Sequence, residues 1–267
     1  MAGIAKRWGV SGLLLAAGLS FAGLALAGPP SAASSAAYGI YAQFTQDGNS
    51  VSFGPIAQIE GSAPPAYDET VAAAPVHQIV PLVAGSIVTP SMFINAADFE
   101  AHVASKGFGV DSVSSEAKTL IKSINLALML NPPPPTASPG LPQPQPFLAL
   151  SARRITSTAD FTKVVPRYAS GTGSATFGGM IVSGTLVANQ KLMFSGDAAK
   201  DTILFQSPTV TITLNQQTQA GLISCSPKCV FTPNSITTNA VDIYLNHANL
   251  GGQIISGEIV LGQAYGN

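Results

Sequence analysis

The sequence contains three histidines, the residue type best suited to acid–base or metal chemistry near neutral pH. His77, His102 and His247 stand far apart in the sequence, whereas metal-binding histidines usually stand two to five residues apart or are joined by the fold. His102 follows Glu100 at the alternate position of an expected strand, so both side chains would share one face. Such a pair is half of a metal site at most, and a solvated strand face is the commoner origin of the pattern.

No motif for nucleophilic or phosphate chemistry is present in the sequence. Ser183 and Ser195 each precede a glycine, but both lack the first glycine of the G-x-S-x-G elbow. The phosphate-binding loop and the dinucleotide fingerprint are also absent. Glycosidase chemistry needs two carboxylates in one cleft, and the acidic residues are mostly scattered singly near turns. We therefore expect no enzyme and no cofactor, and keep a secreted hydrolase as the last alternative.

Two oxygen-rich turns are weak candidates for a calcium site. Asp47 and Asn49 flank a glycine, and Asp197 and Asp201 follow Gly196 closely. Neither turn has the ligand spacing of an EF-hand. Because Asp, Asn and Gly are common in turns without any metal, solvated turns are the simpler interpretation.

The two cysteines, Cys225 and Cys229, frame a three-residue loop that contains Pro227. In an exported protein this spacing predicts a disulfide that shapes the tip of a hairpin. A loop this short constrains the unfolded chain little, so the bridge contributes about 2 kcal/mol. The spacing is not C-x-x-C, and no second ligand pair supports a zinc site.

The N-terminal residues predict export from the cytoplasm. Lys6 and Arg7 precede an apolar stretch at residues 10–27, which ends in the small-residue sequence Ala25, Leu26, Ala27. This is the pattern of a signal peptide over residues 1–27, with an uncleaved membrane anchor as the alternative. We expect a secreted, extracellular or cell-surface protein without a transmembrane segment in the mature chain, with the periplasm as a further location.

The charge of the chain limits its partners. Charged residues make up 9% of the sequence, against about 25% in typical globular domains. Without Lys6 and Arg7, ten basic residues remain against thirteen acidic ones, a net charge of −3. No basic patch is available for nucleic acid. A surface with so few charges suits contact with copies of the same chain or with a cell-surface polymer.

Alternating residues predict an all-β fold of the sandwich or jelly-roll kind. Residues 28–37 read as a flexible mature N-terminus, and residues 38–267 as a single β-rich domain. Residues 131–146 are rich in proline and predict a surface loop. Residues 114–124 are ambiguous: Ser114 could cap a short helix, while a strand is favoured from residue 122 onward.

The C-terminal half resembles the choice-of-anchor P family of exported bacterial surface proteins. The similar segments are residues 173–184, 209–217, 239–245 and 257–262, together with residues 37–40 near the expected mature N-terminus. The resemblance implies a surface protein without an established activity. Members typically carry a C-terminal anchoring segment, and none follows the last strand here, so release or non-covalent attachment is expected. Gln216 also departs from the family, where we expect an acidic residue.

The features together favour a non-catalytic structural or adhesive protein. We expect self-association in which the first strand completes the sheet of a neighbour. The strand-donor residues would be Tyr38, Ile40, Ala42 and Phe44. The alternative is a module that binds a glycan or another polymer, which predicts at least two exposed tyrosines on one face. The candidates are Tyr38, Tyr41, Tyr67 and Tyr168.

Overall fold

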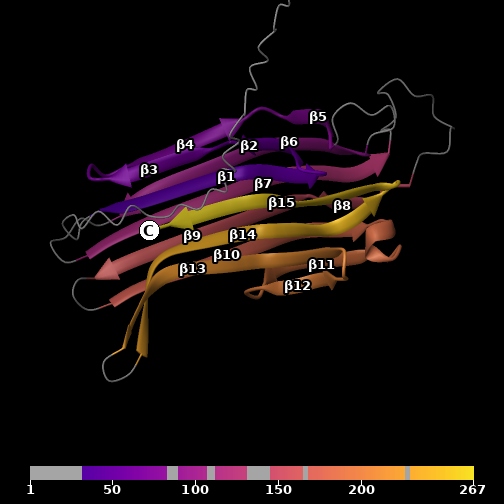
Figure 1. Cartoon of the computed structure of the whole chain (residues 1–267). Coiled ribbons are helices and arrows are strands. Elements are labelled where there is room, and N and C mark those ends of the chain that lie inside the picture. The colour runs from indigo at the N-terminus through magenta and orange to yellow at the C-terminus, as the bar shows by residue number, and fades with distance from the viewer. Residues whose placement is uncertain (1–31, 83–89, 107–111, 131–144, 165–167, 226–228) are drawn as a thin grey trace, which may run out of the picture.

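The computed structural model describes residues 32–82, 90–106, 112–130, 145–164, 168–225 and 229–267. These residues form two antiparallel sheets that pack face to face as a β-sandwich (Figure 1). The predicted all-β class is confirmed. The expected signal peptide and residues 131–144 of the expected Pro-rich loop lie outside the described residues.

Sheet I has seven strands in the order β12-β13-β14-β15-β1-β2, and β3 pairs with the first part of β1. Strands β12 to β15 pair in chain order, and β2 and β3 both pair with the same edge of β1. The last strand, β15, pairs with the other edge of β1. The strands are β1 (Ala33–Gln46), β2 (Asn49–Ile56), β3 (Ile59–Ala63), β12 (Thr202–Gln206), β13 (Val210–Cys225), β14 (Cys229–Leu250) and β15 (Gln253–Gly266).

Sheet II has eight strands, and its main path is β11-β10-β8-β7-β6-β4. Strand β9 pairs with both β10 and β7, and β5 pairs with β6. The strands are β4 (Asp68–Ala73), β5 (Val76–Pro81), β6 (Pro90–Lys106), β7 (Ser112–Leu130), β8 (Leu148–Ala152), β9 (Arg154–Val164), β10 (Tyr168–Ser183) and β11 (Leu192–Ala198). A single 3-10 turn, η1 (Thr185–Val187), is the one helical element among the described residues.

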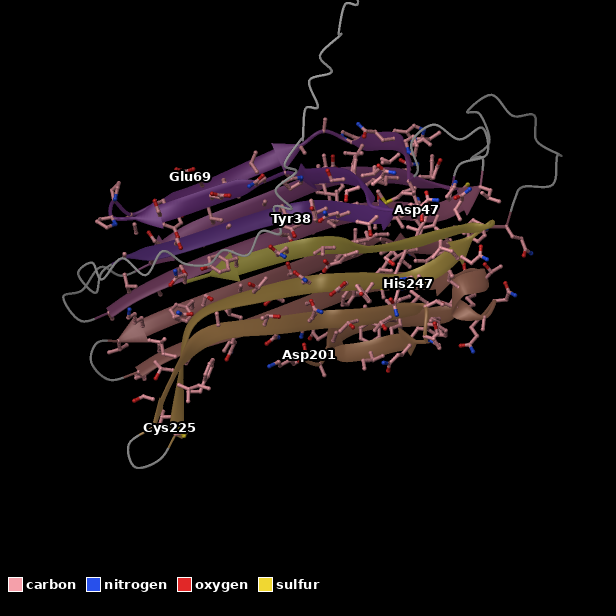
Figure 2. The ribbon with its side chains drawn as sticks, viewed as in Figure 1. Tyr38, Asp47, Glu69, Asp201, Cys225 and His247 are labelled. Atoms are coloured by element: carbon pink, nitrogen blue, oxygen red, sulfur yellow. A yellow bond between two sulfur atoms is a disulfide. The ribbon has the colours of Figure 1, made fainter. Side chains whose placement is uncertain are left out.

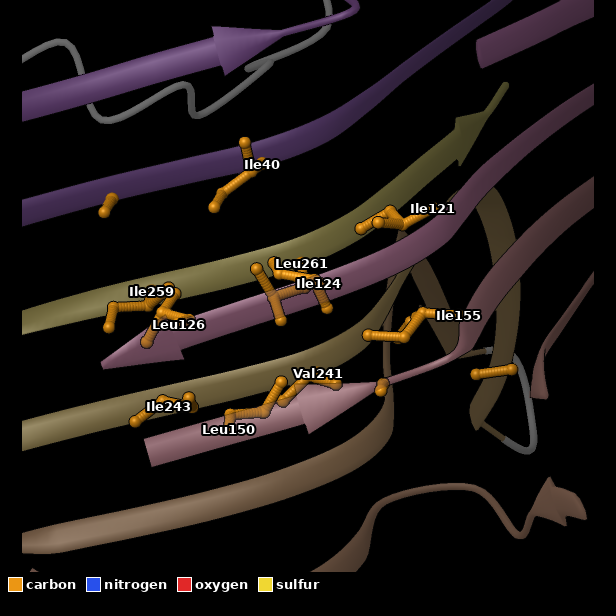
Figure 3. Close-up of a cluster of buried hydrophobic side chains, with 14 of the residues drawn as sticks. Ile40, Ile121, Ile124, Leu126, Leu150, Ile155, Val241, Ile243, Ile259 and Leu261 are labelled. Atoms are coloured by element: carbon orange, nitrogen blue, oxygen red, sulfur yellow. The ribbon is translucent and has the colours of Figure 1, made fainter. Parts of the chain in front are cut away.

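The core fills the space between the two sheets (Figure 3). Sheet I contributes Ile40, Val241, Ile243, Ile259 and Leu261, and sheet II contributes Ile121, Ile124, Leu126, Leu150 and Ile155. Each of these side chains is at most 1% exposed. Burying an aliphatic side chain of this size stabilises a fold by about 1.5–3 kcal/mol, so this layer holds the sheets together.

The ambiguous segment belongs to strand β7 along its whole length, so the helix considered for residues 114–124 is wrong. Side chains of β7 alternate, and Val113, Ser115, Ala117, Thr119 and Ile121 are buried. Two of these inward positions hold small polar residues, which weakened the two-residue period in the sequence. Thr119 is accommodated because its hydroxyl bonds to Ser157 Oγ at 2.7 Å.

Strand β1 lies in the interior of sheet I, which changes the self-association hypothesis. It begins at Ala33, earlier than the expected start at Tyr38. One edge of β1 pairs with β15, and the other edge pairs with β3 and β2. The donor strand predicted from Tyr38, Ile40, Ala42 and Phe44 therefore does not hold in the folded chain, because both rows of backbone groups are already bonded.

The hairpin formed by β13 and β14 extends beyond the sandwich, and the disulfide closes its end (Figures 1 and 2). The Cys225–Cys229 bridge is present, with the two Cα atoms 3.9 Å apart, so the predicted disulfide is confirmed. Four apolar side chains of this projecting part are strongly exposed. We call them the hairpin tip: Leu222, Ile223, Val230 and Phe231.

Candidate functional site

A row of residues crosses four strands of sheet I at the point where the side-chain alternation changes phase. The row contains Asn215 of β13, Ala240 of β14, Gly262 of β15 and Gly39 of β1, which face each other in the register of the sheet. Asn215 and Gly262 have φ angles of 51° and 64°. At this row two consecutive residues of a strand face inward, as Ala240 and Val241 do, while the register between the strands stays the same on either side.

Small residues are needed in this row because the two sheets approach closely there. A Cβ atom on Gly39 would collide with the ring of Phe99. A Cβ atom on Gly262 would lie 2.8 Å from the hydroxyl oxygen of Thr119. The row therefore depends on glycine at both positions.

The change of phase brings polar side chains together on the outer face of sheet I. The side chains of Ala240 and Val241 both belong to the buried core, so Asn239 and Asp242 point outward on either side of them. In a regular strand, residues three apart would point to opposite faces. The result is a dense outward cluster over β13, β14, β15 and β1, which we call the tyrosine face: Tyr38, Tyr41, Gln216, Asn239, Asp242, Tyr244, Glu258 and Gln263.

A chain of amide hydrogen bonds runs across this face from strand to strand. Gln263 Nε2 donates to Asn239 Oδ1 at 2.9 Å, and Asn239 Nδ2 donates to Gln216 Oε1 at 2.9 Å. Gln216 also lies close enough to lower the pKa of the Asp242 carboxyl, and Gln263 lowers that of the Tyr38 hydroxyl. The amides are thereby fixed in orientation, which prepares the face for a polar ligand.

Two tyrosines of β1 lie near the carboxylates of the tyrosine face: Tyr38 is close to both, and Tyr41 is close to Glu258. The rings of Tyr38 and Tyr41 meet edge to face, with their centroids 6.2 Å apart. Tyr244 is 51% exposed, whereas Asp242 is only 6% exposed and lies at the base of the cluster. Figure 2 shows Tyr38 on β1, between β15 and the edge of sheet I.

Burial shifts the titration of the groups on this face. Desolvation, and next the charge of Glu258, raise the pKa of Asp242 to about 7, and the bond from Gln216 only partly opposes them. Burial also raises the pKa of the Glu258 carboxyl. The pKa of Tyr38 rises for the same reasons, burial first and Glu258 second, so its hydroxyl stays protonated at neutral pH.

The structure keeps the three histidines apart. Glu100 and His102 share the outward face of β6, and His102 Nε2 lies 2.8 Å from Asp68 Oδ1 of the adjacent strand β4. The ring of His77 packs edge to face on Phe93. His247 lies at an irregularity of β14, where its ring bonds to Asn246. Within the described part of the chain, no three His, Cys, Asp or Glu side chains gather as a metal site would require.

Of the two turns named as calcium candidates, the one with Asp197 and Asp201 uses its carboxylate oxygens within the protein. Asp197 Oδ1 accepts a hydrogen bond from Thr176 Oγ1 at 2.6 Å, and Asp201 Oδ1 accepts one from the Gln217 backbone at 2.8 Å. Asp47 has a φ of 48° in the turn between β1 and β2. Gly48 follows it, and Asn49 is the first residue of β2. Figure 2 shows Asp47 and Asp201 on separate strand connections.

Comparison with known proteins adds little to this description. No family model and no curated protein matches the chain. Among solved structures, the attachment invasion locus protein Ail of Yersinia pestis aligns with 88% of this chain and 98% of its own, at 6% identity and a TM-score of 0.16. A likeness at this level does not indicate a shared fold. In the described residues, no helix has the length and apolar character needed to cross a membrane.

Sequence reasoning identified Tyr38 and Tyr41 as glycan-binding candidates but missed the carboxylates beside them. Of the other tyrosines it considered, Tyr67 is buried and bonds to Ser35 Oγ at 2.7 Å, and Tyr168 lies exposed on sheet II. Asp242 comes from a different strand, distant in sequence. The one available signal was the pair Ala240 and Val241, which interrupts the alternation of β14.

Proposed function

We propose that this chain is a non-catalytic adhesive protein of the cell exterior, which binds a polyhydroxylated polymer through the tyrosine face. The observation that carries the proposal is the clustering of tyrosine rings around an ordered row of amides on one sheet face. The export expected from residues 1–27 would place this face where such polymers occur.

The two kinds of side chain match the two kinds of surface on a sugar. A sugar ring has an apolar face of C–H groups, which packs on the electron-rich face of an aromatic ring. Its hydroxyls both donate and accept hydrogen bonds, as the amides of Gln216 and Gln263 also do. Tyrosine combines an apolar ring with a polar hydroxyl and loses little conformational entropy on binding. A tyrosine and amide surface therefore suits a sugar better than an apolar ligand.

The shape of the site suits a long ligand. The tyrosine face spans four adjacent strands of sheet I. A polymer that lies across these strands repeats the same weak contact at successive sugars, and the linked contacts raise the overall affinity. Adhesion of this kind requires no reaction at the bound polymer.

A polysaccharide panel tests the proposal directly. The mature chain, beginning at residue 28, is applied to immobilised neutral, acidic and amino polysaccharides, and bound protein is measured after washing. Binding to at least one polymer supports the proposal, and its release by the soluble form of that polymer confirms specificity. Failure to bind any of them overturns it, and so does chromatography showing that the polymer is shortened.

A second candidate function, self-association, is favoured by the hairpin tip. Leu222 and Ile223 are 73% and 71% exposed, and Val230 and Phe231 are 57% and 47% exposed. Such a group of apolar side chains usually marks an interaction site. Sheet II carries an apolar groove of about 710 Å³, lined in part by Met180, Met193 and Phe194. The tip of one copy entering the groove of the next would give a head-to-tail chain of molecules.

A further inference from the structure

In the part of the chain that the structure describes, neither carboxylate of the tyrosine face has a positive partner. Asp242 of β14 and Glu258 of β15 lie on neighbouring strands, close enough for the charge of Glu258 to act on Asp242. Asp242 is 6% exposed, and its Oδ1 atom is buried without a hydrogen-bond partner. Among the described residues, no lysine, arginine or histidine forms an ion pair with either carboxylate.

An unpaired buried carboxylate oxygen is costly, and this one lies among the polar side chains of the tyrosine face. The neighbouring groups do not relieve it. The Gln216 amide reaches Asp242 but leaves Oδ1 free. A positively charged ligand group would satisfy all of these features together.

The available acceptors favour an ammonium group over a metal ion. Calcium takes six to eight oxygen ligands. The amide oxygens of Gln216 and Asn239 already accept hydrogen bonds from their neighbours, which leaves mainly carboxylate oxygens for a metal. A protonated amine needs only three acceptors for its three N–H groups. Asp242 Oδ1, the Glu258 carboxylate and a tyrosine hydroxyl supply that number.

We propose that Asp242 and Glu258 bind the protonated amino group of an amino sugar within the polymer. The inference rests on the proposed function and names its substrate class, a polysaccharide with free amines. The amine would lie between the two carboxylates, while its own sugar ring and the adjacent rings pack on Tyr41 and Tyr244. A sugar whose amine is acetylated has no charge to offer and would leave Asp242 Oδ1 unpaired.

Titration calorimetry with two matched oligomers tests the inference. The probes are a glucosamine oligomer and the N-acetylglucosamine oligomer of equal length, at near-neutral pH and low salt. The native chain should bind the glucosamine oligomer at least about tenfold more tightly, the range of one charge-assisted hydrogen bond. Asp242→Asn and Glu258→Gln should each remove most of this preference. Glu69→Gln, an exposed carboxylate of β4 on sheet II, should retain it.

The outcomes separate the inference from the function on which it rests. Equal affinity of the native chain for both oligomers overturns the inference and leaves the polymer-binding function intact. A preference that survives in both carboxylate variants also overturns it. Circular dichroism of each variant checks that the fold is retained. If no polysaccharide of the panel binds, the proposed function fails instead.

Discussion

Asn239 and Asp242 point from the same face of strand β14, although three positions separate them along the strand. The extra inward residue between them, Ala240, belongs to a row that crosses β13, β14, β15 and β1. The row determines which side chains reach the outer face of sheet I. Without it, Asn239 or Asp242 would enter the core, and the tyrosine face would lose its amide row or its carboxylate.

Gly262 should be among the most sensitive positions of sheet I. Replacing Gly262 with alanine adds both left-handed strain at a φ of 64° and a collision with Thr119. We expect a loss of about 2–4 kcal/mol in the free energy of unfolding. Gly196→Ala is the matched control, because its φ is 93° but no atom lies near the added methyl group. Urea denaturation should show the smaller loss for Gly196→Ala; equal losses would contradict the close packing of the row.

Because of Asp242, the free energy of unfolding should fall as the pH rises. Its pKa is raised from 3.8 to about 7, so between these values the folded chain holds a proton that the unfolded chain has lost. Stability from this group is therefore greatest below about pH 4 and falls until about pH 7. Glu258 on β15 and Tyr38 on β1 are the titratable groups that act on it.

Asp242→Asn removes this dependence and keeps the size of the side chain. At pH 8 the variant should be more stable than the native chain by on the order of 3 kcal/mol, and at pH 4 the two should be similar. Urea denaturation at both pH values measures the difference, and Glu69→Gln serves as an exposed control. A variant that is less stable than the native chain at pH 8 would show that the ionised carboxylate is stabilised in the fold.

The hairpin tip gives a prediction for the second candidate function. Leu222→Ser and Phe231→Ser together should shift the protein toward monomers, because they remove exposed apolar contacts without touching the sandwich core. Met193→Ser in the groove of sheet II should have the same effect if the groove receives the tip. Sedimentation velocity over a range of concentrations measures the change. A native chain that stays monomeric at the highest concentration excludes this self-association.

The sequence predicted much of the fold because most strands alternate visibly. The alternation of apolar and polar residues is not visible where inward positions hold small polar residues, as Ser115 and Thr119 do in β7. The interior position of β1 could not be predicted, since its partners β15 and β3 are fixed by tertiary pairing. The tyrosine face was only half accessible to sequence reasoning. Its tyrosines were visible as candidates in the sequence. Its carboxylates come from β14 and β15, and Asp242 faces outward only because the alternation changes phase at Ala240.

Ligand affinity of a tyrosine variant tests the central claim most directly. Tyr41→Ala with Tyr244→Ala should weaken binding of the polymer selected from the panel by at least about tenfold, because two stacking rings are lost. Tyr168→Ala removes a tyrosine of 57% exposure from sheet II and should bind like the native chain. Equal affinity of the double variant and the native chain would contradict the assignment of the tyrosine face as the binding surface.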